Sequence, residues 1–116
     1  MELIIYKTKY TTADPINNFM HFYYSLRMNH LASDLLAKGL SPKQITDAVL
    51  RAIQVGKSSG IDINRHFMPV FSGIDQEIIG DCKLSHLAYG LVLMNADVEL
   101  SAVGKWQISV LKKFLK

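Results

Sequence analysis

The longest run of uncharged, apolar residues in the chain, LAYGLVLM, extends from Leu87 to Met94. Exposing such a run to water is unfavourable, so the fold must be built around it as a buried helix. It is far shorter than the roughly 20 residues that cross a bilayer. Ser85 is the predicted N-cap, and the polar sequence Asn95-Ala96-Asp97 ends the helix. A close approach of another helix would explain the glycine at position 90.

A second helix has the clearest local signals, in SPKQITDAVLRAIQVGKSSG from residue 41 to 60. Ser41 is the predicted N-cap, Pro42 takes the first helical position and Gln44 completes a capping box. Gly60 marks the end. Apolar residues recur at three- and four-residue steps and predict one core face: Ile45, Ala48, Val49, Ala52, Ile53 and Gly56.

Two further helical regions flank these. The first begins at Asp14 and Pro15 and ends at Gly39, as either two helices or one bent helix interrupted at residues 29–30. The second begins near Ser101. Its predicted apolar stripe consists of Val103, Trp106, Val110, Leu111 and Phe114.

Two segments have the character of strands. Residues 2–10 are rich in β-branched and aromatic side chains, and a hairpin is predicted over about residues 67–80, with SGID as its turn. Pro69 places its strand at a sheet edge. The predicted fold is therefore a single α+β domain over residues 1–116, mostly helical, with four to five helices packed around a central helix at about 85–94. Its small sheet consists of the hairpin, with or without residues 2–10.

Composition narrows the class of protein. Hydrophobic residues make up 49% and charged residues 20% of the 116 residues, values that argue against disorder. The start, MELIIYKTKY, carries an acidic residue where a signal peptide has positive charge. A single cysteine, Cys82, fits a reducing compartment. These features predict a cytoplasmic protein without a membrane partner.

No catalytic motif is present. The phosphate-binding glycine loop, nucleophile elbow, metalloprotease helix and EF-hand loop are all absent. Cys82, His86 and His66 could be drawn as a partial metal site, but the paired-cysteine spacing of structural zinc is missing. The acids Asp75, Glu77, Asp81 and Asp97 are interpreted as solvated turn residues. We therefore expect no metal, no cofactor and no enzymatic activity.

Basic residues are distributed unevenly. The net charge is +3, and no acidic residue follows Glu99. One interpretation is that these residues contact DNA phosphates. The other is that they complement the dipole at the C-terminal end of a helix and keep the protein soluble. The DNA-contact candidates are Lys105, Lys112, Lys113, Lys116, Arg51 and Lys57.

Aromatic residues crowd positions 19 to 24. At helical spacing they are interpreted mainly as core residues. The alternative is a partner or oligomer interface, for which Phe22 and Tyr24 are the candidates, and homo-oligomerisation stays open.

The order of motifs from RA through SGI and HF to KLS resembles the DNA-damage-inducible protein D family. This family is related to the N-terminal domains of Bro and phage antirepressor proteins. The resemblance covers about residues 48–110. The matching residues are Arg51, Ala52, Ser59, Gly60, His66, Phe67, Lys83, Leu84, Ser85, Ala88, Leu91, Asn95, Asp97 and Gln107.

The resemblance implies a non-enzymatic regulator in the bacterial DNA-damage response or in phage-type regulation, which acts through DNA or a DNA-processing protein. One hypothesis is direct DNA contact through the basic face of the last helix. The alternative is a protein-interaction module that modulates a recombination, repair or repressor protein. Asn95 and Asp97 are expected to cap a helix and form a turn, and His66 to be a packed, hydrogen-bonded histidine.

Overall fold

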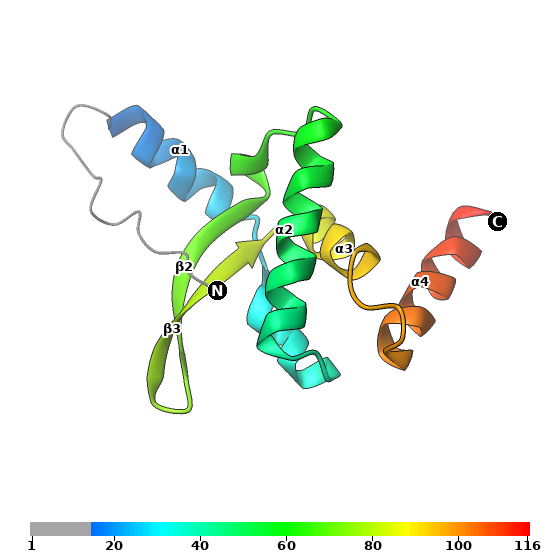
Figure 1. The fold of residues 1–116 in the computed structure, drawn as a ribbon. Helices are drawn as coiled ribbons and strands as arrows, with labels where there is room; N and C mark the ends of the chain where they lie inside the picture. Colours follow the sequence, from blue (N-terminus) through cyan, green and yellow to red (C-terminus); the bar gives the residue numbers. More distant parts are fainter. Residues whose placement is uncertain (1–14) are drawn as a thin grey trace.

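The computed structural model describes residues 15–116, and its architecture is α+β and mostly helical, as predicted. The predicted strand over residues 2–10 and the predicted N-cap Asp14 lie outside the described residues. Figure 1 shows the order of elements. They are α1 (Pro15–Ser25), β1 (His30–Leu31), the 3-10 helix η2 (Ala32–Lys38), α2 (Pro42–Ser58), the 3-10 helix η3 (Ile63–Arg65), β2 (Phe67–Ile74), β3 (Glu77–Leu84), α3 (His86–Met94) and α4 (Ser101–Phe114).

Helix α2 forms as its local signals predict. The hydroxyl of Ser41 accepts a hydrogen bond from the backbone N–H of Gln44 at 3.1 Å, and the Gln44 side chain accepts one from the Ser41 N–H at 2.8 Å. Together these bonds satisfy donors that a helix start leaves unpaired. The predicted core face is buried except at Ile53, which is half-buried.

The region before α2 contains two separate helices, α1 and η2. Gly39 ends η2 with φ of 96°, the left-handed conformation predicted for it. The interruption at residues 29–30 leads into β1, which pairs antiparallel with the end of β3, opposite Leu84 and Lys83. A two-residue strand carries no alternation in sequence, so local pattern did not reveal it.

The hairpin is present, but its turn is shifted from the prediction. Strands β2 and β3 pair from Phe67 opposite Leu84 to Ile74 opposite Glu77, which leaves Asp75 and Gln76 as a two-residue turn. Both have positive φ, 51° and 67°, as a type I′ turn requires. The predicted turn residues 72–74 instead extend β2. The sheet order is β1-β3-β2, so Pro69 lies in an edge strand, as predicted.

The core lies between the sheet, α2 and α3, and α3 lies between α2 and α4 (Figure 1). Ala88, Val92 and Leu93 of α3 are buried. The prediction that the whole run 87–94 is buried is wrong at its ends, because Leu87 is 49% and Met94 47% exposed. An uncharged sequence has no polar face to reveal which side meets solvent, so the pattern could not locate these two residues. None of the helices between residues 15 and 116 has the length and apolar character to cross a bilayer.

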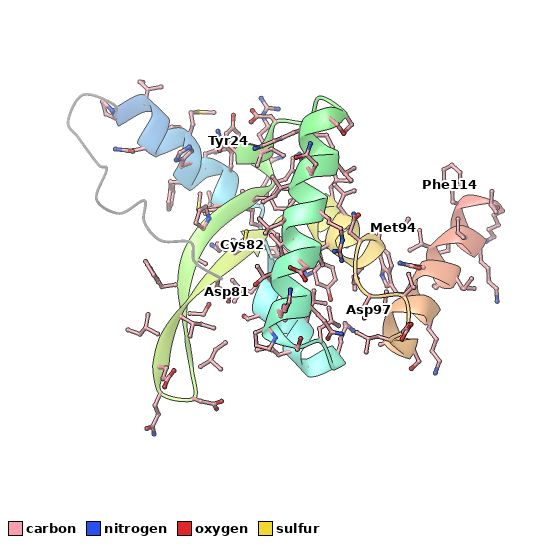
Figure 2. The ribbon with its side chains drawn as sticks, in the orientation of Figure 1. Tyr24, Asp81, Cys82, Met94, Asp97 and Phe114 are labelled. Atoms are coloured by element: carbon pink, nitrogen blue, oxygen red, sulfur yellow. The ribbon has the colours of Figure 1, made fainter. Side chains whose placement is uncertain are left out.

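Helix α4 packs mainly on α3. Trp106 lies over Gly90, since a Cβ built on that glycine would be 3.7 Å from the indole, which is the helix approach predicted from the sequence. The predicted apolar stripe is only partly buried: Val103 is in the core, whereas Leu111 is exposed and Phe114 is 80% exposed. Figure 2 shows Phe114 near the C-terminal end of α4.

Candidate functional site

Three exposed lysines lie on the solvent side of α4 and just beyond its C-terminal end. Lys105 and Lys112 are exposed seven residues apart, a spacing that places them on one face of α4, and the exposed Lys116 follows two residues after the helix ends at Phe114. Residues 101–116 contain no acidic side chain to neutralise them. We call these three residues the α4 lysine face. Lys113 is also exposed but lies on the flank towards α3, where it lines a depression with Trp106 and Val110.

The orientation of α4 is fixed where α3 ends. The side-chain amide of Asn95 donates to the Leu91 carbonyl at 2.8 Å, and that of Gln107 donates to the Leu93 carbonyl at 3.2 Å. Each carbonyl also accepts a backbone N–H, from Asn95 and Ala96 respectively, so the side-chain amides add a second donor at the end of α3. Gln107 thus links α4 directly to the last turn of α3.

Two residues of α2 hold the same junction from the other side. Arg51 donates twice to the Asn95 carbonyl, from Nε at 3.1 Å and from Nη2 at 2.7 Å. Gln44 donates to one carboxylate oxygen of Asp97 at 3.3 Å, while the other accepts from the Glu99 N–H at 2.9 Å. The expectation that Asn95 and Asp97 cap a helix and form a turn is confirmed, and Figure 2 shows Asp97 in the turn between α3 and α4.

The DNA-contact candidates therefore occupy different environments. The guanidinium of Arg51 already binds a backbone carbonyl, so its role in the fold is defined by that contact. Lys57 is exposed in the last turn of α2. The structure does not bring Arg51 and Lys57 into the α4 lysine face, which leaves the α4 residues as a separate cationic surface.

The interpretation of the aromatic segment as core is wrong for its outer residues. Phe19 and Phe22 of α1 are each 60% exposed, and Tyr23 is exposed as well. The reason is that α1 lies outside the sheet and meets the remainder of the described chain mainly through η3. Phe22 is therefore available at the surface, whereas Tyr24 is half-buried beneath the guanidinium of Arg65.

A cavity of about 560 Å³ opens between α1, η3 and the start of α3. Two arginines stack on tyrosines in its wall: Arg27 lies 5.5 Å from the ring centre of Tyr23, and Arg65 lies 5.3 Å from that of Tyr24. Figure 2 shows Tyr24 beside the segment that follows α2. We call this cavity the arginine pocket; its lining includes Tyr23, Tyr24, Arg27, Arg65, His66 and His86.

His66 is a packed, hydrogen-bonded histidine, as predicted, with Nδ1 2.7 Å from the hydroxyl of Ser85. The side chain also faces the arginine pocket. Phe67, the next residue, is buried in the core, and Lys83 lies half-buried in β3. The sequence predicted a packed His66, with a partial metal site alongside Cys82 and His86 as the alternative, and did not reveal the two arginines beside it.

His30 and His86 form a histidine pair that the sequence did not predict. His30 Nε2 lies 3.3 Å from His86 Nδ1, and the His30 ring stacks on Tyr89 with centroids 4.2 Å apart. In the chain from residue 15 onward, no three His, Cys, Asp or Glu side chains gather as ligands for a metal ion. The partial metal site drawn from Cys82, His66 and His86 is not assembled there.

Asp81 contradicts the interpretation of the acids as solvated turn residues. It lies in β3, is only 1% exposed and accepts three hydrogen bonds. The donors are the Ser33 N–H at 3.1 Å, the Cys82 N–H at 2.8 Å and the Ser72 hydroxyl at 2.6 Å. Asp81 thus joins η2 to the hairpin. Asp75, in contrast, is an exposed turn residue as predicted.

No protein-family model matches the chain. No curated protein and no solved structure matches it either. The resemblance to the DNA-damage-inducible protein D family therefore stays a hypothesis.

We expect the thiol of Cys82 to be unreactive in the folded protein. Burial, with a smaller contribution from the charge of Asp81, raises its pKa from 9.0 to about 12, despite a backbone hydrogen bond that lowers it. Only the thiolate attacks a thiol reagent. At pH 8 an aromatic disulfide reagent should therefore label Cys82 only after denaturant is added. Rapid labelling without denaturant would contradict the prediction.

The same shift predicts a loss of stability at alkaline pH. Between pH 9 and 12 the unfolded thiol ionises while the folded thiol stays protonated, so the free energy of unfolding falls as pH rises. The contribution is at most about 1.4 kcal/mol per pH unit. A Cys82→Val variant, measured by urea unfolding at pH 8, 9 and 10, should show a shallower decline than the natural chain.

Proposed function

We propose that this protein is a non-enzymatic regulator that contacts DNA through backbone phosphates, with the α4 lysine face as its contact surface. The observation that supports the proposal is the presence of three exposed lysines, two on one face of α4 and one just after its end, on a segment without acidic residues. The resemblance described above favours a cytoplasmic role in the bacterial DNA-damage response or in phage-type regulation.

The spacing of the lysines suits this role. A rise of 1.5 Å per residue separates Lys105 from Lys112 by about 10 Å along α4, and Lys116 follows shortly after the end of the helix. Several phosphates of one strand can therefore be neutralised at once. Such contacts carry no sequence information and weaken steeply with salt, because binding releases condensed counterions.

The test is fluorescence anisotropy of labelled double-stranded DNA at ~50 and ~200 mM salt. If three phosphates are neutralised, affinity should fall about 40-fold between these concentrations, and about 20-fold for single-stranded DNA. Absence of binding to both forms at the lower salt would refute the proposal.

A charge-matched pair of variants locates the contact. Lys105→Gln/Lys112→Gln should abolish most of the affinity and reduce the salt slope by about 2. Lys38→Gln/Lys43→Gln removes the same charge from η2 and α2, including the exposed Lys43–Asp47 ion pair, and should change affinity little. Equal losses in both variants would show that the net charge, and not the α4 lysine face, governs binding.

A second candidate function is a protein-interaction module that modulates a recombination, repair or repressor protein. The exposure of Phe19 and Phe22 on α1 favours it, because exposed large aromatic side chains are enriched at interfaces. A folded protein that binds neither form of DNA at ~50 mM salt is the result expected from this second function.

A further inference from the structure

We infer that the arginine pocket is a binding site for a phosphate group, separate from the α4 lysine face. It lies between α1, η3 and the start of α3, and none of its lining residues belongs to α4. The inference therefore does not depend on the proposed function and can fail or succeed without it.

Both guanidinium groups are held in place before any ligand binds. Arg27 stacks on Tyr23 and donates from Nη2 to its hydroxyl at 3.2 Å, and Arg65 stacks on Tyr24. Stacking on a ring face leaves the N–H groups at the guanidinium edge free to donate. Two such planar donors in one cavity match the oxygens of a phosphate, which arginine binds in bidentate fashion.

The histidine side of the pocket supplies a further donor. The hydroxyl of Ser85 accepts from the Ala88 N–H at 3.1 Å, so its own proton is free to go to His66 Nδ1, 2.7 Å away. This arrangement favours the tautomer of His66 with its proton on Nε2. That N–H, together with the positive end of the α3 dipole beside Ser85, adds to the attraction for an anion.

Little negative charge opposes this cluster. Among the described residues, one carboxylate makes an ion pair with either arginine: Asp62, whose oxygen lies 3.6 Å from Arg65 Nε. Both partners of this pair are largely exposed, so it is weak and can be exchanged for a ligand. The cavity volume of about 560 Å³ accommodates more than inorganic phosphate, and a nucleoside monophosphate or the phosphorylated end of a DNA strand has the matching chemistry.

Titration with inorganic phosphate, followed by NMR of the backbone amides and imidazole C–H groups at constant ionic strength, tests the inference. Phosphate should produce saturable shifts at His66, Ser85 and His86. Arg27→Gln and Arg65→Gln should each raise the dissociation constant about tenfold or more. Asp62→Asn keeps an oxygen to cap η3 and should lower it about two- to fivefold.

Two controls separate this site from the DNA surface. Lys105→Gln/Lys112→Gln should leave phosphate binding unchanged, and circular dichroism should show all variants folded. Shifts that do not saturate, or that persist in an Arg27→Gln/Arg65→Gln variant, would overturn the inference.

Three further probes distinguish the sources of the phosphate group: adenosine monophosphate, a 5′-phosphorylated tetranucleotide and the same tetranucleotide without the phosphate. Tighter binding of either phosphorylated probe than of inorganic phosphate identifies that source, and binding of the unphosphorylated strand with equal affinity overturns the inference.

Discussion

Replacing Asp81 with alanine is expected to destabilise the protein by about 3 kcal/mol or more. The carboxylate accepts from two backbone N–H groups and one hydroxyl, and its removal leaves these donors without their acceptor. A buried donor without a partner costs roughly 1–3 kcal/mol; here the bond from the Cys82 N–H is buried and those from Ser33 and Ser72 are partly buried. Urea unfolding followed by circular dichroism measures the change in the free energy of unfolding.

Two further variants test the cause. Asp81→Asn retains one oxygen for the Ser33 and Cys82 N–H groups, so it should lose less stability than Asp81→Ala. Asp75→Asn, in the exposed turn, should change the free energy by less than about 0.5 kcal/mol. If Asp81→Ala also falls within this range, the carboxylate does not stabilise the junction of η2 with β3.

The second large effect contrasts two leucines of the same helix. Leu93 of α3 is 1% exposed, and Leu93→Ala should cost about 2–5 kcal/mol through lost burial and the cavity that remains. Leu87→Ala, at the exposed start of α3, should cost less than about 1 kcal/mol. Alanine favours the helix slightly more than leucine does, so propensity does not explain the difference.

Thermal and urea unfolding of the two variants side by side provide the measurement. Equal losses at both positions would mean that the whole uncharged run is buried, as its sequence alone predicts. The exposure of Leu87 at the start of α3 would then be incorrect.

The sequence predicted those parts of the fold that depend only on residues close to one another in the chain. The capping box of Ser41 and Gln44, the proline at the start of α2 and the glycine at the end of η2 each act within a few residues. The hairpin and its edge proline also followed from short-range pattern. These features are determined by neighbours in sequence, so they need no knowledge of the tertiary structure.

The remaining features depend on contacts between distant segments. The burial of Asp81 requires Ser33 from η2 and Ser72 from β2 as donors. No spacing in the sequence indicates that these two residues contact Asp81. The exposure of Phe19 and Phe22 depends on how α1 docks, which its helical period does not specify. Because the sequence of α3 is apolar on all sides, the side that faces solvent can be identified only when the neighbouring elements are known.

The candidate sites divide in the same way. The lysines of α4 were named from the sequence, because charge and helical spacing are local properties. Tyr23 and Arg27 are four residues apart, a spacing at which helical side chains contact each other, so the contact between them could be inferred from the sequence. Arg65 reaches the pocket from η3, and only the folded chain brings it beside Tyr24.

The position of Pro69 affects how copies of this chain meet in concentrated solution. Within the described residues strand β2 is at the edge of the sheet, and an edge strand can be a template on which a second chain adds a strand and begins to aggregate. Proline in a sheet occurs where its nitrogen faces solvent, so an incoming strand would find one donor missing at residue 69. The missing donor at this position hinders growth of the sheet between molecules.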